Sequence, residues 1–312
     1  MFVRYDIVHT TVYRYREAVR FGEHRVMFRP RDSHDLRVLA TDLEISPDAD
    51  VRLIQDPHSN SVALVQPRQM AAELRIVCSF TIEHGHSYNL ELPLSPGAEY
   101  FPFAYAVSER FDLEPYLRPH YDDPQGKLTA WARRFMRTDG PTRTRDLLVA
   151  MNQHIRAQFA YVARDEEGTQ TPLQTLERGT GSCRDFALLM MEAARHLGVA
   201  TRFVTGYLYD PATDSGAAQP PSAAASGTAD GDDAIIVGAG VTHAWLQAYL
   251  PGAGWVPFDP TNNLLGGTQL IRVAVARDPG EAAPITGSWF GNPSAYLGLD
   301  VSVQVRRHLR SR

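Results

Sequence analysis

A cysteine at the start of a predicted helix is the first feature of this chain that suggests chemistry. Cys183 follows two nearby glycines, Gly179 and Gly181, and comes directly after Ser182. Ser182 is a good helix N-cap, and Asp185 three residues later approximates a capping box, so Cys183 is expected at the first helical position. The free N–H groups and the positive end of the helix dipole there favour a thiolate, the nucleophilic form of cysteine. The backbone N–H of Cys183 is also a natural donor to an oxyanion.

The second cysteine, Cys78, has a different environment. It lies in an alternating stretch, 73–83, where every second residue is apolar, so it is expected to be a small buried side chain on one face of a strand. Simple burial is also the structural alternative for Cys183, which could merely pack against a sheet. The two cysteines lie far apart in the sequence and form no C-x-x-C pair, which argues against a zinc site.

A thiolate nucleophile needs a base, and a hairpin predicted near the end of the chain offers one. His243 lies in a strand-like stretch, 242–250, and Asp259 closes a second, 255–259, after the turn-forming residues 251–254. Such a hairpin brings the two to the same end of the ribbon, with Pro257 expected to introduce a bulge. Asp259 would then hold the tautomer of His243. The structural alternatives are a packed strand histidine and an Asp-Pro turn, and the conjunction with Cys183 favours catalysis.

The elements that must position these residues fall into two regions. Alternation from Tyr5 to Tyr15 and short stretches at 36–46, 51–55, 61–66 and 73–83 predict an antiparallel sheet or sandwich. The stretch 93–124 is rich in Pro, Tyr and Phe and shows no clear periodicity, so the domain boundary is placed within it. We therefore expect a β-rich N-terminal domain over residues 1–110.

Residues 111–312 are expected to form an α+β core with helices packed on an antiparallel sheet. Helical spacing is found over 128–135, 147–159 and 182–197, and strand-like stretches over 200–209, 242–250, 255–259, 269–275 and 299–305. The intervening segment 211–240 is dominated by Ala, Gly, Ser, Pro and Asp. Such a composition buries too little apolar surface to offset its ordering entropy, so it is expected to be a flexible insertion.

Composition and charge narrow the classes of protein. With 44% hydrophobic and 21% charged residues the chain has the balance of a soluble globular protein. The formal net charge of -5 does not favour binding to nucleic acid or to an anionic membrane. No stretch approaches the roughly 20 apolar residues that span a bilayer, and the first residues lack the pattern of a secretory signal. A cytoplasmic location with reduced cysteines is expected.

Taken together, four motifs resemble those of bacterial transglutaminase-like proteins, a family of the papain-like cysteine superfamily. They are Gly179-x-Gly181-x-Cys183-Arg184-Asp185-Phe186, Gly206-Tyr207, His243-Ala244-Trp245 and Gly254-Trp255-x-x-Phe258-Asp259-Pro260-Thr261. The match covers most of residues 140–305, and the preceding β-rich region resembles the N-terminal domain that often accompanies this core. The resemblance implies a papain-like core with Cys183 as nucleophile, His243 as base and Asp259 as the acid that orients the base.

Two further positions, Tyr161 and Asp278, lie outside these three assignments. Tyr161 could approach the oxyanion in this fold, although a strand or helix-end tyrosine is more commonly part of a core. Around Asp278 the family often has a Gly before Arg277 and a Tyr after the aspartate, whereas this chain has Ala276 and Pro279. The resemblance therefore assigns Asp278 no specific role.

The expected reaction is attack of the Cys183 thiolate on an amide or Gln carboxamide of a protein or peptide, which gives a thioester. Water would resolve it in a cysteine protease or amidase, and a primary amine in a transglutaminase; the sequence does not separate these outcomes. No cofactor or metal is expected, because there is no phosphate loop, EF-hand loop or ligand cluster. The alternative from another class is a non-catalytic protein- or peptide-binding module that retains the fold. Oligomeric state and calcium dependence stay open.

Overall fold

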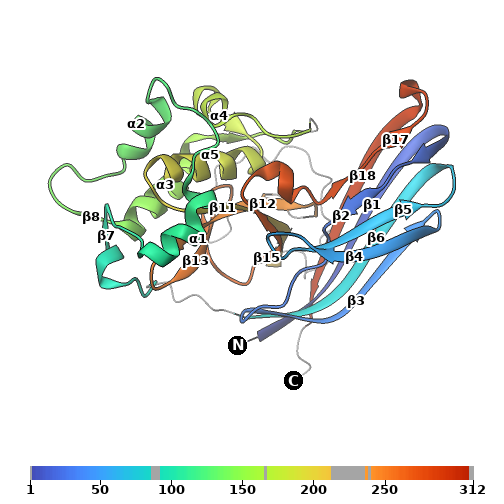
Figure 1. Cartoon of the computed structure of the whole chain (residues 1–312), viewed down its shortest axis with the longest axis horizontal. Helices are drawn as coiled ribbons and strands as arrows, with labels where there is room; N and C mark the ends of the chain where they lie inside the picture. The colour runs from blue at the N-terminus through green and yellow to red at the C-terminus, as the bar shows by residue number, and fades with distance from the viewer. Residues whose placement is uncertain (1, 86–91, 165–166, 212–235, 238–239, 309–312) are drawn as a thin grey trace.

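The N-terminal region is a β-sandwich, in the computed structural model that describes residues 2–85, 92–164, 167–211, 236–237 and 240–308 (Figure 1). The long strand β1 (Phe2–Phe21) pairs with β6 (Ala71–Gly85), and β6 with β3 (Leu36–Ser46), all antiparallel. The second sheet has the order β16 (Ile285–Thr286), β2 (His24–Val26), β5 (Ser61–Pro67) and β4 (Ala49–Gln55). Apolar side chains of both sheets, among them Ile7 and Val65, form one buried cluster. The predicted sandwich is therefore present.

The end of the chain returns to this sandwich. Strand β18 (Tyr296–Arg307) pairs antiparallel with β1, from Tyr5 opposite Arg307 to Tyr15 opposite Tyr296, and β17 (Trp289–Phe290) pairs with the end of β1. In Figure 1 this red strand runs alongside the blue one. The predicted core, 111–312, thus ends in strands that pair with the N-terminal sheets. Alternation predicts that a strand exists but says nothing about its partner.

The helices of the core include the three predicted from periodicity. These are α2 (Lys127–Arg133), α3 (Thr144–Gln158) and α5 (Cys183–His196), and Gly198 follows α5 with a φ of 84°. Two helices were not predicted. Helix α1 (Val107–Leu117) contains Pro115 and a weak apolar pattern, and α4 (Pro172–Arg178) is short. The stretch 93–124, which shows no clear periodicity in the sequence, therefore contains a regular helix.

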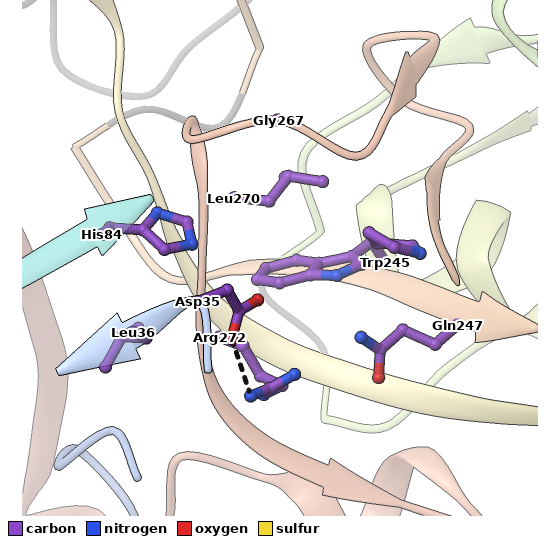
Figure 2. Close-up of a pocket in the computed structure, with 9 residues that line it drawn as sticks. Asp35, Leu36, His84, Trp245, Gln247, Gly267, Leu270 and Arg272 are labelled. Atoms are coloured by element: carbon purple, nitrogen blue, oxygen red, sulfur yellow. Dashed lines mark ion pairs between the residues drawn. The ribbon is translucent and has the colours of Figure 1, made fainter. Parts of the chain in front are cut away.

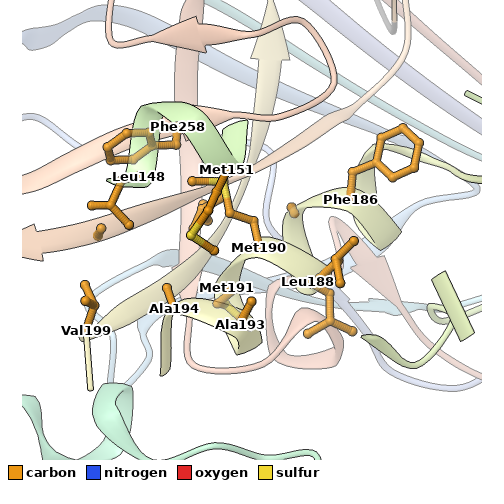
Figure 3. Close-up of a cluster of buried hydrophobic side chains, with 14 of the residues drawn as sticks. Leu148, Met151, Phe186, Leu188, Met190, Met191, Ala193, Ala194, Val199 and Phe258 are labelled. Carbon is orange, nitrogen blue, oxygen red and sulfur yellow. The ribbon is translucent and has the colours of Figure 1, made fainter. Parts of the chain in front are cut away.

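The core sheet has the order β14 (Leu264–Leu265), β13 (Gly254–Asp259), β12 (His243–Leu250), β11 (Thr201–Leu208) and β15 (Leu270–Ala276), with neighbours antiparallel. Helix α5 packs on one face of it. Met190 and Ala194 of α5 lie in a buried cluster with Leu148 of α3 and Phe258 of β13 (Figure 3). The α+β prediction is confirmed. The predicted insertion, 211–240, lies outside the described residues apart from 211, 236, 237 and 240.

Strands β11 and β15 also contribute side chains to the sandwich. Tyr207 and Ile271 belong to the same buried cluster as the sandwich residues. The Tyr207 hydroxyl lies 2.9 Å from Nδ1 of His9 and donates to the Phe28 carbonyl at 3.1 Å. Because these partners are all buried, the core sheet and the N-terminal sandwich share one hydrophobic core.

Short elements complete the connections. Residue pairs form β7 (Tyr100–Phe101) with β8 (Thr142–Arg143), and β9 (Ala160–Tyr161) with β10 (Thr180–Gly181). Single 3-10 turns are found at Pro96–Ala98, Pro279–Ala282 and Pro293–Ala295. Within the described ranges, no helix combines the length and apolar character needed to cross a membrane.

Candidate active site

Cys183 is the first residue of α5, and Ser182 is its N-cap in an extended conformation. The Asp185 carboxylate accepts hydrogen bonds from the backbone N–H and the hydroxyl of Ser182, both at 2.8 Å. This is the contact that a capping box makes from its third residue back to the cap, as predicted. The arrangement places the thiol and backbone N–H of Cys183 at the positive end of the helix dipole.

Asp185 also forms hydrogen bonds with the segment that precedes the helix. Its other oxygen accepts from Nη1 of Arg164 at 2.8 Å and from the backbone N–H of Gln170 at 2.7 Å. The Gln170 side chain in turn donates to the Thr180 carbonyl at 3.1 Å. With its carboxylate fully buried and paired, Asp185 fixes the loop that leads into Cys183.

The two cysteines differ in environment and not in burial. Both are free thiols, with 3% of Cys78 and 8% of Cys183 exposed. Cys78 lies on β6 in the sandwich core, and burial raises its pKa to about 11. This confirms the interpretation of Cys78 as a structural residue. Cys183 instead lies at a helix start, close enough to His243 to influence the pKa of the imidazole.

His243 and Asp259 are brought together by the predicted hairpin. His243 begins β12 and Asp259 ends β13, and Nε2 of His243 lies 2.9 Å from Oδ2 of Asp259. Both side chains are buried. The pairing runs without interruption from Leu250 opposite Gly254 to Leu246 opposite Phe258. The expected bulge at Pro257 is therefore absent from this hairpin, and Pro257 lies opposite Gln247 in regular register. Its missing N–H is tolerated because only the short strand β14 pairs with the other edge of β13.

The charges of this pair support each other. Burial of the imidazole lowers the pKa of His243, but the Asp259 carboxylate and the Cys183 thiolate raise it more strongly, and the net direction is upward. For Asp259, burial raises the pKa, whereas His243, Asn262 and Thr261 lower it, and the net direction is downward. An imidazolium facing a carboxylate is thus the favoured charge state.

The second ring nitrogen of His243, Nδ1, takes no part in the contact with Asp259. Nδ1 is buried and has no hydrogen-bond partner of standard geometry among the described residues. Cys183 lies close enough to the imidazole to contribute to the raised pKa of His243. Nε2 is therefore held by Asp259, whereas Nδ1 makes no such contact among the described residues.

Asp259 is surrounded by hydrogen-bond donors. Its Oδ1 accepts from the backbone N–H of Thr261 at 2.9 Å and, more weakly, from that of Asn262 at 3.4 Å. Its Oδ2 accepts from Nδ2 of Asn262 at 2.9 Å, besides His243. Sequence reasoning did not single out Asn262. The polar run that follows Asp-Pro was the available signal, but nothing in it distinguishes a partner of Asp259 from a turn residue.

Trp245, two residues beyond His243 on the same strand, packs against the imidazole. The ring centroids are 6.0 Å apart with an interplanar angle of 27°. Trp245 also lines a small hollow of about 20 Å³ with Asp35, His84 and Arg272, where Asp35 and Arg272 pair at 3.8 Å (Figure 2). The hollow has room for about one water molecule, and none of the three candidate catalytic residues lines it. It lies between residues of the sandwich and residues of the core sheet and is not part of the candidate site.

The two residues left open by the sequence fall in different places. Tyr161 lies on β9, opposite Gly181 of β10, two residues before Cys183. Burial raises its pKa, and the Cys183 charge raises it further, so the phenol keeps its proton close to the thiol. Asp278 instead caps a 3-10 turn by accepting from the Gly280 N–H at 3.0 Å, and lies 3.5 Å from His120. None of the described contacts of Asp278 is with Cys183, His243 or Asp259.

Metal ligation finds no support in the part of the chain that the structure describes. No group of three or more His, Cys, Asp or Glu side chains there lies close enough to hold an ion.

A helix-start cysteine with a histidine and an aspartate on neighbouring antiparallel strands defines the papain-like class of cysteine site. Two family models match the chain in order. The bacterial transglutaminase-like N-terminal region matches residues 5–83, and the transglutaminase-like superfamily matches residues 129–260. The chain belongs to the bacterial transglutaminase-like family, as its motifs indicate.

Similar proteins extend over nearly the whole chain. An uncharacterised protein of Mycobacterium leprae is 27% identical over 309 residues, covering 97% of this chain and 99% of the relative. One of Mycobacterium tuberculosis is 28% identical over 316 residues, covering 97% and 92%. The crystal structure of a candidate cysteine protease from Cytophaga hutchinsonii superposes with a TM-score of 0.67 at 18% identity, over 100% of this chain and 92% of the other. At that identity the likeness concerns the fold.

Proposed function

We propose that the protein catalyses thiol acyl transfer on amide groups of proteins or peptides, with Cys183 as nucleophile, His243 as base and Asp259 as the residue that orients the base. The observation that carries the proposal is the buried 2.9 Å hydrogen bond between His243 and Asp259 beside a cysteine at a helix start. It holds one nitrogen of the imidazole, and in this proposal the other nitrogen exchanges a proton with the thiol, as nucleophilic catalysis requires.

The first half-reaction forms a thioester. The Cys183 thiolate attacks the amide carbonyl carbon, and an electron pair moves onto the carbonyl oxygen. The backbone N–H of Cys183, which lacks an intrahelical partner at the first helical position, stabilises this oxyanion. The protonated phenol of Tyr161 is a second donor in this proposal. When the C–N bond breaks, its electron pair leaves with the nitrogen, which takes the Nδ1 proton of the His243 imidazolium and departs as amine or ammonia.

The second half-reaction releases the acyl group. His243, now neutral, accepts a proton from a water molecule or a primary amine as that nucleophile attacks the thioester carbonyl. The C–S bond breaks, Cys183 leaves as a thiolate, and the imidazolium is restored. Water as acceptor makes the protein a protease or amidase, and an amine makes it a transglutaminase. The raised pKa of His243 supports this cycle at neutral pH, because the imidazolium persists beside the thiolate.

The proposal is tested by incubating the protein with a glutamine-containing protein and an isotopically labelled primary amine. Mass spectrometry separates amine incorporation, deamidation and backbone cleavage, and each product identifies the acyl acceptor. Activity should be lost in Cys183→Ala and kept in Cys78→Ala, which removes the thiol in the sandwich core. If well-folded protein yields none of the three products over varied substrates, the non-catalytic binding module replaces the proposal.

Iodoacetamide labelling gives a second measurement that needs no substrate. Cys183 should be modified faster than Cys78 at neutral pH, because Cys78 is held as a thiol by its raised pKa. Equal and slow modification of both cysteines would contradict an activated Cys183.

A further inference from the structure

We propose that Asn262 is a positioning residue for the candidate acid: its side-chain amide fixes the Asp259 carboxylate in the orientation in which it holds His243. The inference rests on the proposed function, since it concerns the same three residues. Asn262 lies three residues after Asp259 and outside the motifs that suggested the site. Its role is indicated by the hydrogen bonds on both ends of its amide.

The orientation of this amide is determined by its neighbours. Oδ1 of Asn262 accepts from the backbone N–H of Val237 at 2.8 Å. A backbone N–H can only donate, so the amide oxygen must face it. The NH2 group is therefore the end that faces Asp259, and it donates to Oδ2 at 2.9 Å and to the Val237 carbonyl at 3.1 Å. The amide cannot flip without setting two donors against each other.

This fixed donor shares its acceptor atom with the histidine. Oδ2 of Asp259 receives both Nδ2 of Asn262 and Nε2 of His243, each at 2.9 Å. Oδ1 is held by the Thr261 N–H. Rotation of the carboxylate about its Cβ–Cγ bond would break the contacts on both oxygens at once. With Asn262 removed, the Oδ2 side is held by His243 alone among the described residues, and the carboxylate and imidazole can turn together.

A purely structural role for Asn262 makes a different prediction. If its function were to anchor the backbone at Val237, an aspartate at 262 would keep the acceptor for the Val237 N–H and lose only the donor to the Val237 carbonyl, whereas alanine loses both, so aspartate should be milder than alanine. If its function is to donate to Asp259, aspartate should be worse than alanine, because a second carboxylate repels the first and cannot donate when ionised. The side chain is half-buried, so an aspartate there carries its charge at neutral pH.

The chain offers a matched control one residue away. Asn263 has a left-handed φ of 54°, which Asn and Asp tolerate, and its Oδ1 accepts from Nδ2 of Asn152 at 3.1 Å. Asn263→Asp keeps that acceptor and makes the same change of charge in the same loop. Comparing Asn262→Asp with Asn263→Asp therefore separates the contact with Asp259 from a general charge effect.

The experiment makes two measurements. NMR gives the rate at which the His243 Nε2–H proton exchanges with solvent, and the signal is assigned through its loss in His243→Gln. Iodoacetamide labelling gives the ratio of the Cys183 alkylation rate at pH 7 to that at pH 9.5. Asn262→Ala should speed the exchange about 10-fold, the lower end for a hydrogen bond to a charged group. Asn262→Asp should speed it further, and Asn263→Asp should match the wild type. The ratio of the alkylation rate at pH 7 to that at pH 9.5 should fall in Asn262→Ala, fall further in Asn262→Asp and stay unchanged in Asn263→Asp, because a thiol without its imidazolium partner is mostly protonated at pH 7.

The inference is overturned if Asn262→Asp is milder than Asn262→Ala, or if Asn263→Asp has the effect of Asn262→Asp. Should Asn262→Ala not fold, as judged by its thermal unfolding, the two aspartate variants still decide the question. The proton-exchange measurement requires neither substrate nor a reactive Cys183. A protein that shows the predicted exchange pattern and no acyl transfer would refute the proposed function and support the role of Asn262.

Discussion

Replacing Asp259 by asparagine tests the site most directly, because the change removes a charge and keeps the shape. Every described group that contacts the Asp259 carboxylate is a donor: the backbone N–H groups of Thr261 and Asn262, Nδ2 of Asn262 and Nε2 of His243. An asparagine side chain offers one oxygen and one NH2 group. In either orientation its NH2 group therefore faces a donor, so at least one buried hydrogen bond is lost.

The magnitude follows from burial. An unsatisfied buried donor costs about 1–3 kcal/mol, and breaking a buried charge pair costs about 3–5 kcal/mol. Since His243 can become neutral once Asp259 is gone, the second figure is an upper bound. We expect the free energy of unfolding of Asp259→Asn to fall by about 2–4 kcal/mol at neutral pH.

The pH dependence of this difference has a definite sign. The folded pKa of His243 is raised above its ordinary 6.5, so its contribution to stability is complete below 6.5 and is lost as pH rises through the folded pKa. The folded pKa of Asp259 lies below 3.8, so its contribution is present above 3.8 and is lost as pH falls through the folded pKa. The stability difference between wild type and Asp259→Asn should be largest between these two ordinary values and shrink on both sides.

Urea unfolding of both proteins across pH, together with acyl-transfer rates, measures the prediction. The rate should fall by about 10⁴, the size of effect that the wrong histidine tautomer has in a triad. Asp278→Asn is the control, because that carboxylate contacts Gly280 and His120 instead. Three outcomes would refute the reasoning: an unchanged unfolding midpoint, a stability difference between wild type and Asp259→Asn that does not vary with pH, or a loss of rate equal to that of the control.

Two further variants test how the sandwich and the core sheet support the site. Tyr207→Phe removes the hydroxyl that contacts His9, and should lower the free energy of unfolding, measured in urea, by about 1–3 kcal/mol. The pH dependence of Cys183 alkylation should stay as in the wild type. An unchanged free energy of unfolding would contradict the shared core. Gly206→Ala places a Cβ 2.1 Å from the backbone oxygen of a β15 residue and 2.7 Å from the Trp245 indole, and should cost about 1–3 kcal/mol through overpacking. It should also slow Cys183 alkylation, because the displaced Trp245 stacks on His243. Wild-type stability and a wild-type alkylation rate would contradict this prediction, since they would mean that β11 can move away from β12 and β15 at no cost.

Local patterns were enough to find the elements that carry the site. The capping residues around Cys183 predict the start of α5, since capping depends on neighbours within one turn. The alternation on either side of the 251–254 turn predicts β12 and β13, and a short turn forces the two strands to pair. The absence of the expected bulge at Pro257 depended on the other neighbour of β13, which no pattern within the hairpin reveals.

Longer-range features required the tertiary structure. Helix α1 was missed because Pro115 and a weak apolar pattern hide it, although packing stabilises it. Which strands share a sheet was also undetermined, since β18 and the core strands have similar alternation and yet β18 pairs with β1.

The sequence by itself determined the chemical identity of the candidate site: a helix-start Cys183 and a hairpin that joins His243 to Asp259. It could do so because each of these placements depends on residues close in the chain. Only the tertiary structure decided what surrounds them. It joined Asn262 to Val237, 25 residues earlier, and set Tyr207 among sandwich residues almost 200 positions away. Such contacts arise from the packing of complete elements, and residues far apart in sequence carry no local pattern that records them.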